Sequence, residues 1–197
     1  MSEKLTKAAQ TLRTRRAILD HARQLFVSQG YAATGTEQMI AGLGVTRGAL
    51  YHQFGDKQGV FRAVIEEVFA EIAAEIEGQA KTGKTAWKQL IRGCYAFLDI
   101  AQREEIRRLL LIEAPAVLDA ETLSMFDRRY GYGLLLNAVQ AAVDEGELDV
   151  PDVEGFTMMI NGALDQLAVW VAQTESAERV KTAKVMAKEL LTLHRKG

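Results

Sequence analysis

The chain has 197 residues, of which 48% are hydrophobic and 25% are charged, values typical of soluble globular proteins. The length supports one large domain or two small ones, and the composition suggests neither a disordered nor a membrane-embedded chain. The net charge of −2 hides an asymmetry. Residues 1–59 carry eight basic and four acidic side chains (net +4), whereas the remainder carries 16 basic and 22 acidic ones (net −6). We therefore expect the first third of the chain to meet a polyanion.

The sequence gives little sign of a targeting signal, and it has a single cysteine. No apolar run approaches the ~18 residues that a membrane-spanning helix needs, and the polar start MSEKLTKAAQ lacks the apolar centre of a signal peptide. We expect a cytoplasmic protein without membrane contact. The single cysteine, Cys94, excludes an internal disulfide and a cysteine-based zinc site, and it is expected to be a small buried hydrophobe.

Apolar residues recur at helical spacing along almost the whole chain, which predicts an all-α fold of about nine helices. The first helix is expected over 12–29, with Gly30 as a left-handed cap. A short second helix is expected to begin at a capping box in which Thr34 and Glu37 satisfy each other's ends. A third helix is predicted over 46–53, capped by Thr46.

A long fourth helix is predicted from its cap Asp56 to about Gly78, followed by the loop QAKTGK. The later helices are expected at 85–101, 104–113, 119–145, 152–173 and 177–194. The change from a basic head to an acidic body falls in or just after the fourth helix. We therefore predict two domains, over residues 12–72 and 73–197.

The second and third helices, joined by a glycine-containing turn, have the outline of a helix-turn-helix, whose second helix enters the DNA major groove. The outline alone is weak, because any helical hairpin supplies it. On the third helix, Val45, Leu50 and Phe54 are placed to anchor it to the core. The opposite, exposed side would hold Arg47, Gly48, Tyr51 and His52.

These exposed residue types suit a nucleic-acid surface. An arginine fork can bind guanine, which favours Arg47 as a base reader, and Gly48 lets the backbone come close. Tyr51 and His52 can donate hydrogen bonds to phosphates. Lys57 follows the cap Asp56, where the helix dipole disfavours a cation unless a phosphate also binds. Hydroxyls and amides for another phosphate are offered by Thr34, Gly35 and Thr36. Taken singly, Tyr51 and His52 could equally be ordinary half-exposed helix residues, and Arg47 a solvated surface charge.

The segment TRRAILDHARQLFVSQGYAATGTEQMIAGLGVTRGALYHQFGDKQGVFRAVIE resembles the DNA-binding domain of TetR-type (TetR/AcrR) transcriptional regulators. The match runs almost continuously from Leu12 to Arg62. It implies a helix-turn-helix over about 35–54, in which Arg47 reads bases and Gly48 and Ala49 lie against the groove. It also implies phosphate contacts from Tyr51, His52 and Lys57. Gly35 departs from the usual serine or threonine, so it is expected to contact DNA only through its backbone amide.

The resemblance implies that the remaining chain binds an inducer and forms a homodimer through its last two helices. A wide apolar band supports the dimer, because one neighbouring helix would not cover it. Its members are Phe156, Met159, Ile160, Ala163, Leu164, Leu167, Trp170 and Val171, with Val180, Met186, Leu190 and Leu193 on the last helix. Alternatively, these helices only close the domain's own core.

An inducer site needs apolar walls with a few polar groups. Candidate walls are Trp87, Tyr95, Phe97, Met125, Phe126, Tyr130, Tyr132 and Met158, with Arg128, Asn161 and Asp165 as polar anchors. Aromatic residues at helical spacing are often plain core, and that alternative holds for each of them. No metal or cofactor is expected.

An enzyme is disfavoured because the three histidines lie far apart in the sequence and no HExxH, GxSxG or phosphate-loop motif occurs. We expect a homodimeric repressor that a small molecule releases from a palindromic operator on double-stranded DNA. In this hypothesis, the ligand changes the spacing of the two DNA-binding heads and depletes the form that fits the operator. The alternatives are a helical protein-interaction module without an inducer and a constitutive DNA-binding regulator.

Overall fold

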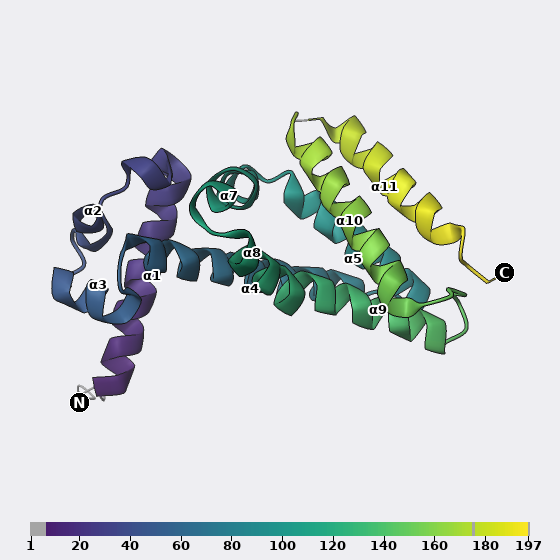
Figure 1. Cartoon of the computed structure of the whole chain (residues 1–197), viewed down its shortest axis with the longest axis horizontal. Helices are drawn as coiled ribbons and strands as arrows, with labels where there is room; N and C mark the ends of the chain where they lie inside the picture. The colour runs from purple at the N-terminus through teal and green to yellow at the C-terminus, as the bar shows by residue number, and fades with distance from the viewer. Residues whose placement is uncertain (1–6, 175, 197) are drawn as a thin grey trace. The chain divides into compact units, whose positions relative to one another are not determined.

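The computed structural model describes residues 7–174 and 176–196. Over these residues the chain is all-α, with one isolated β-bridge between Leu148 and Arg195 and no strand. The elements are α1 (Lys7–Ala33), α2 (Thr36–Ile40), α3 (Arg47–Phe54), α4 (Lys57–Ala80), α5 (Ala86–Ala101), α6 (Glu104–Ile106), η1 (Arg107–Glu113), α7 (Ala114–Val117), α8 (Ala120–Phe126), η2 (Asp127–Tyr132), α9 (Gly133–Asp144), α10 (Val153–Ala172) and α11 (Ala177–Thr192) (Figure 1). Both η segments are π-helical.

Several of these elements follow one another without a break, so they form nine helical stretches within the described residues, as the sequence predicts. None of these helices is long and apolar enough to cross a membrane. The predicted helix over 119–145 is a single stretch, but its middle is π-helical, which divides it into α8, η2 and α9. Glu3 and Lys4, which count toward the basic head, lie outside the described residues.

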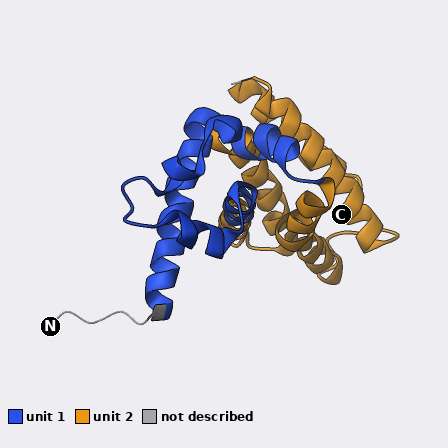
Figure 2. Cartoon of the chain, turned by 60° about the vertical axis from the view of Figure 1, so that its left-hand side comes forward, with its two compact units in different colours: residues 1–67, 108–119 blue, residues 68–107, 120–197 orange. Residues whose placement is uncertain are grey.

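The chain forms two compact units (Figure 2). Unit 1 consists of Met1–Glu67 and Arg108–Asp119, and unit 2 of Val68–Arg107 and Ala120–Gly197. The helix α4 runs through Glu67 and through the predicted domain boundary at residue 72 without interruption. Periodicity in the sequence does not predict that the short segment Arg108–Asp119 belongs to unit 1.

Unit 1 packs α1 to α4 around apolar side chains that recur at helical spacing. Its buried residues include Ile18, Leu19, Ala22 and Phe26 of α1, Met39 of α2, Leu50 of α3, and Val60, Phe61, Val64 and Ile65 of α4. Phe26 and Phe61 meet edge to face with ring centroids 5.0 Å apart, and Tyr31 packs on both rings. These aromatic contacts stabilise the core of unit 1, which supports the short helices α2 and α3.

The segment Arg108–Asp119 is bound to the rest of unit 1 through polar contacts. The Tyr31 amide donates a hydrogen bond of 3.2 Å to the Glu113 carboxylate, which also lies 4.0 Å from the Arg108 guanidinium. The Gln58 side chain donates to the Val117 carbonyl at 2.7 Å. Two parts of the chain that are far apart in sequence therefore share one folding unit.

The start of α2 differs from the prediction. Thr34 and Glu37 do not form a capping box, because the Thr34 hydroxyl donates to the Gly30 carbonyl at 2.7 Å. The cap residue is Gly35, whose amide donates to Gln38 Oε1 at 2.6 Å. Gly30 interrupts α1 near the predicted end, but its φ of 85° and ψ of 166° are not those of a left-handed cap.

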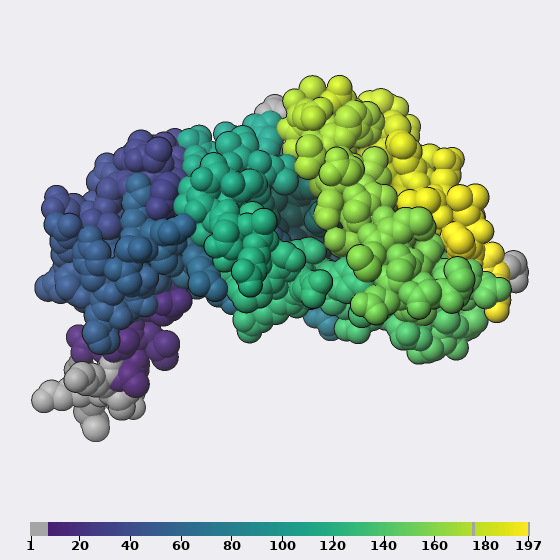
Figure 3. Space-filling model, viewed as in Figure 1, coloured from purple at the N-terminus to yellow at the C-terminus, as the bar shows by residue number. Residues whose placement is uncertain are grey.

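Unit 2 packs α5, α9, α10 and α11 around a second core, which includes Leu90, Cys94, Leu98, Val139, Ile160 and Leu191. Cys94 is buried as predicted, and burial raises the pKa of its thiol to about 12. The side chains of Thr85, Asp152 and Ser176 cap α5, α10 and α11, respectively. In Figure 3, the atoms of α10 (light green) and α11 (yellow) lie beside one another at the surface of unit 2.

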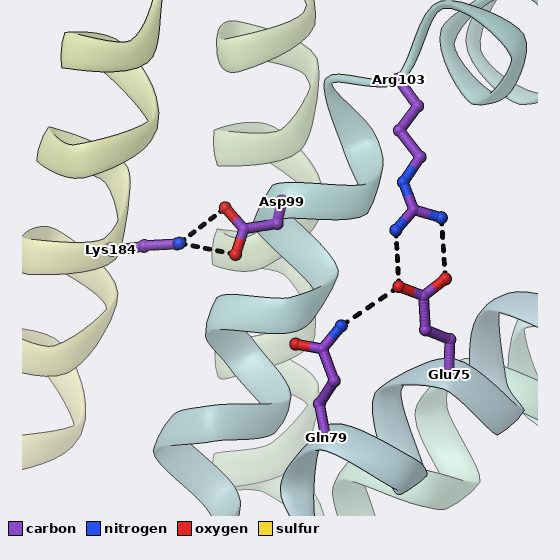
Figure 4. A network of polar contacts seen from close by, with 5 residues as sticks. All are labelled: Glu75, Gln79, Asp99, Arg103 and Lys184. Atoms are coloured by element: carbon purple, nitrogen blue, oxygen red, sulfur yellow. Dashed lines mark hydrogen bonds and ion pairs between the residues drawn. The ribbon is translucent and has the colours of Figure 1, made fainter.

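Two ion-paired contacts join the helices of unit 2 (Figure 4). Arg103 forms a two-pronged pair with Glu75 of α4 at 2.5 and 2.7 Å, and Gln79 donates to the same carboxylate at 3.1 Å. The Arg103 guanidinium lowers the pKa of Glu75. Lys184 of α11 lies 2.6 Å from Asp99 of α5. The first pair connects α4 to the turn between α5 and α6, and the second connects α11 to α5, the central helix of the unit.

Candidate DNA-binding surface and ligand cavity

The short helix α3 is fixed at both ends. Its cap is Thr46, whose Oγ1 accepts a hydrogen bond of 3.2 Å from the Ala49 amide, which confirms the predicted helix start. At the other end, the Gly55 amide donates to the Tyr51 carbonyl at 2.8 Å. Leu50 is fully buried, and the Arg15 guanidinium lies 4.6 Å from the centre of the Phe54 ring. One side of α3 therefore belongs to the core of unit 1.

The structure places Arg47, Gly48, Tyr51 and His52 together on the exposed side of α3. Arg47 donates a hydrogen bond of 3.3 Å to Tyr51 Oη and lies 3.7 Å from the Glu37 carboxylate. The bond from Arg47, followed by one from Thr36, lowers the pKa of Tyr51. These contacts are solvent-exposed and therefore weak, so the arginine fork can exchange them for a base edge.

The turn from α3 to α4 also brings Lys57 close to α1. The Lys57 ammonium lies 4.1 Å above the Tyr31 ring and 3.5 Å from the Ala32 carbonyl. Asp56 caps α4, because its Oδ1 accepts a 2.7 Å bond from the Gly59 amide, as predicted. Gly59 itself packs so closely on the Phe54 carbonyl that a β-carbon at position 59 would overlap it. Nothing in the sequence pattern identified Gly59 as a determinant of the position of α3.

Most of the donor groups of the predicted phosphate-binding site at the start of α2 already have hydrogen-bond partners within the protein. Thr34 is buried, and its amide and hydroxyl both donate to carbonyls within the protein. The Gly35 amide is occupied by Gln38. Thr36 is half-buried beside Tyr51. We therefore correct the role of Thr34: its side chain holds the end of α1 and does not reach the surface.

A cavity of about 250 Å³ lies inside unit 2, between α4, α5, η2, α9 and α10. Three of the sequence candidates line it: Phe97, Asn161 and Asp165. Asp127 lines it too, although the sequence analysis did not select it. Its place in a π-helical turn, a feature that recurs at functional sites, has no period that could be read from the sequence.

The other candidates for the ligand site do not line this cavity, for reasons that differ. Trp87 and Phe126 are buried core residues, and the Tyr132 hydroxyl donates to the Glu154 carbonyl at 3.4 Å. Met125 and Arg128 line a separate surface depression. The rings of Tyr95 and Tyr130 contact the cations of Lys184 and Arg129, respectively. The last candidate, Met158, is 63% exposed.

The apolar band on α10 and α11 divides into two sets. Phe156, Ile160, Leu164, Val171 and Val180 are buried in unit 2, so the alternative of a closed core is correct for them. A surface groove of about 820 Å³ is lined by Ala163, Gln166, Leu167, Met186, Glu189, Leu190, Thr192 and Leu193. Trp170 is half-buried and carries the Arg179 guanidinium 5.2 Å from its ring. Met159 is exposed on the same helix.

An all-α chain with a basic head and a short, surface-exposed second helix in a helix-turn-helix defines a DNA-binding regulator. Residues 18–64 match the description "Bacterial regulatory proteins, tetR family", and residues 87–193 match "Tetracyclin repressor-like, C-terminal domain". The chain therefore belongs to the TetR family of bacterial transcriptional regulators. This membership confirms both the resemblance found in the sequence and the prediction that the chain is not an enzyme.

Individual relatives agree with this assignment. The chain is 37% identical over 112 residues to the HTH-type transcriptional regulator AcrR of Shigella flexneri, a match over 56% of this chain and 51% of AcrR. It is 38% identical over 65 residues to the HTH-type transcriptional repressor ComR of Escherichia coli, covering 33% and 31% of the two chains. The matches thus span about half, or less, of these relatives. A TetR-family regulator from Pectobacterium atrosepticum has the same fold, with a TM-score of 0.75, 29% identity, and coverage of 96% of this chain and 95% of that one.

Proposed function

We propose that the protein is a homodimeric, ligand-responsive repressor that binds a palindromic operator and is released from it by a small molecule. The observation that carries the DNA-binding part is the α3 surface. Its Arg47, Tyr51 and His52 side chains are exposed together, while Leu50 and Phe54 hold the opposite side in unit 1. Basic and hydroxyl groups on an anchored helix fit the major groove of double-stranded DNA.

In the proposed complex, Arg47 reads a guanine edge, and Gly48 and Ala49 allow the backbone to approach the bases. The phosphate contacts come from Tyr51, His52 and Lys57, with Thr36, Thr46 and the Gly35 amide beside them. Lys57 would exchange its contacts with the half-buried Tyr31 ring and the Ala32 carbonyl for a phosphate, because a charged acceptor binds an ammonium more strongly than either of them. The buried Thr34 contributes only indirectly, by holding the end of α1 through its hydrogen bond to the Gly30 carbonyl.

The groove on α10 and α11 supports the homodimer. Met186 is 50% exposed, Leu193 is 79% exposed, and partly buried leucines continue the apolar surface between them. A second copy of the chain would cover this surface through a two-fold, self-complementary contact. Dimerisation also suits recognition, because one eight-residue helix reads few bases whereas two helices about 34 Å apart read a palindrome.

Replacing Met186 by glutamate is expected to weaken the dimer by about tenfold or more, because each copy would bury a carboxylate in an apolar contact. Sedimentation equilibrium measures this dissociation constant. Met158→Glu is the matched control, since Met158 is 63% exposed and does not line the groove. Equal dissociation constants for the two variants would place the dimer contact elsewhere.

The cavity in unit 2 supports the inducer part of the proposal, because it is enclosed mainly by apolar side chains and offers a few polar groups. In the proposed homodimer, the distance between the two DNA-binding domains must match the operator. A ligand that binds more tightly to a form in which this distance does not match would deplete the operator-binding form. The required observation is a change of operator affinity upon addition of a cavity ligand. Without such a change, the protein would be a constitutive DNA-binding regulator.

Selection of bound sequences from random double-stranded DNA tests the DNA-binding part. We expect an enriched palindrome, and an affinity that falls steeply with salt because several phosphates are neutralised. A protein-interaction module would enrich no sequence and would lack this salt dependence. Locating the enriched site in the source genome would then identify the regulated genes.

A further inference from the structure

Two aspartates from different helices meet at the cavity of unit 2. Asp127 comes from η2 and Asp165 from α10, and both line the cavity. The single amide of Asn161 serves both, at 3.5 Å from Asp127 Oδ2 and 3.1 Å from Asp165 Oδ2. An amide nitrogen has two hydrogens, so this arrangement leaves most of the acceptor capacity of the two carboxylates unused.

The described residues supply no cation for these two carboxylates. Lys81, the lysine at the cavity wall, lies 2.9 Å from Glu77, so this pair is already neutral. Partial burial raises the pKa of Asp127. Asp165 is exposed as a residue, but local shielding of its carboxyl group and, secondly, the Asp127 carboxylate raise its pKa to about 6. Near neutral pH the two carboxylates therefore bring negative charge to the cavity that no described residue of its wall balances.

The local backbone keeps this arrangement in place. Asp127 and Gly131 both line the cavity from the π-helical turn. A β-carbon at position 131 would lie 2.8 Å from Asp127 Oδ1, so a side chain there would displace the carboxylate. The glycine therefore allows the aspartate its position, and the widened turn is the kind of irregularity that tends to occur at binding sites.

The remaining wall limits the size and polarity of an occupant. Apolar contacts come from Ile76, Leu90, Phe97, Leu134, Leu135 and Leu164. The volume of about 250 Å³ is near the lower end of small-molecule sites, which start at roughly 300 Å³. A small apolar body fits such walls, and a carboxylate or phosphate on it would be repelled by the two aspartates.

We propose that the cavity selects small organic cations, in which a protonated amine on an apolar body binds between Asp127 and Asp165. This inference rests on the proposed function, since it names the chemical class of the inducer. The amine would donate to the unused carboxylate oxygens and balance their charge, and the apolar body would fill the space lined by Phe97 and the leucines. Neutral analogues of the same shape would lose the charged contact, and anionic ones would be excluded.

Matched probe series test the proposal by calorimetry on the full chain. The amines are butylamine, benzylamine and phenethylamine, each compared with the corresponding alcohol and carboxylate. At pH 7.5 we expect an amine to bind about tenfold or more tightly than its alcohol, with no measurable binding of the carboxylates. Equal or tighter binding of the alcohols or carboxylates would overturn the proposal, and so would no binding of any amine.

Isosteric variants locate the binding. Asp165→Asn and Asp127→Asn should each weaken amine binding by about tenfold and leave alcohol binding within about twofold. Asp144→Asn is the control, because Asp144 lies on α9 outside the cavity wall. Unchanged amine affinity in both cavity variants would remove the proposed site.

The pH dependence provides a readout that does not need DNA. The titratable groups at the cavity are Glu77 of α4, Lys81 just after α4, Cys94 of α5, Asp127 of η2 and Asp165 of α10. Asp165 has a folded pKa of about 6, above its ordinary 3.8, so the folded state holds its proton more tightly and loses stability as pH rises through this window. Without ligand, Asp165→Asn should therefore melt at a higher temperature than the wild type above pH 6 and at a similar temperature below pH 4. Amine binding to the wild type should weaken as pH falls through 6, and a flat profile would count against the proposal.

The proposal and the proposed function can fail separately. If neutral or anionic molecules bind the cavity and release the operator, the inducer function stands and the choice of a cation falls. If amines bind through the aspartates without changing operator affinity, the cation site stands and the inducer function falls.

Discussion

Replacing Arg47 by alanine should weaken binding to the preferred operator by about 1–3 kcal/mol and relax base choice at one position of each half-site. The arginine is exposed at the start of α3, and its internal partners Glu37 and Tyr51 are exposed as well. Loss of the side chain therefore removes a contact to DNA without disturbing the core of unit 1. Selection from random DNA and titration of the best site measure both effects.

Lys57→Ala is the informative counterpart of this variant. A phosphate contact carries no sequence information, so this change should weaken all sequences alike and reduce the dependence of affinity on salt. Both variants should keep the far-ultraviolet circular dichroism of the wild type. An Arg47→Ala protein with the wild-type site and affinity would show that another residue reads the bases.

The second large effect is expected at Gly59. A β-carbon at this position would overlap the Phe54 carbonyl oxygen, which belongs to the backbone and cannot swing aside. Gly59→Ala should therefore shift the end of α3, reduce the free energy of unfolding of unit 1 by about 1–3 kcal/mol, and reduce operator binding. Denaturant titration and a DNA-binding assay measure the two losses.

Gly78→Ala is the matched control, because it makes the same change on the same helix and a β-carbon there meets nothing within 4 Å. It should leave operator binding unchanged, and the better helix propensity of alanine could add up to about 1 kcal/mol of stability. If the two variants are equally stable and bind DNA equally well, the tight turn between α3 and α4 does not position α3.

The parts of the fold that follow from local chemistry were predictable from the sequence. Thr46, Asp56 and Thr85 are capping residues next to regular apolar spacing, and each caps the helix that was expected to begin there. The predicted capping box at the start of α2 was wrong, because two sets of local hydrogen bonds compete for the same groups. Thr34 finds an acceptor in the Gly30 carbonyl, which leaves the longer Gln38 side chain to satisfy Gly35. A capping pattern does not reveal which of its groups tertiary structure has already taken.

The candidate site shows the same limit at a larger scale. Exposure of Arg47 and Tyr51 followed from the position of Leu50 on the opposite side of one short helix. In unit 2, by contrast, apolar spacing could not separate the buried Ile160 from Leu193, which is 79% exposed. Asp127 was missed because its position depends on a π-helical turn and on packing between helices that are distant in sequence.

The discontinuity of unit 1 bears on how this regulator can be re-engineered. Transferring residues 1–67 to another effector body would leave the Tyr31 amide without the Glu113 carboxylate and the Gln58 side chain without the Val117 carbonyl. A transplant that keeps the head intact must also carry Arg108–Asp119, a segment that the native chain reaches only after leaving the head and passing through α5. Exchanging this unit in a chimeric regulator therefore requires three junctions, one within α4 and one at each end of the grafted segment Arg108–Asp119, and not a single cut.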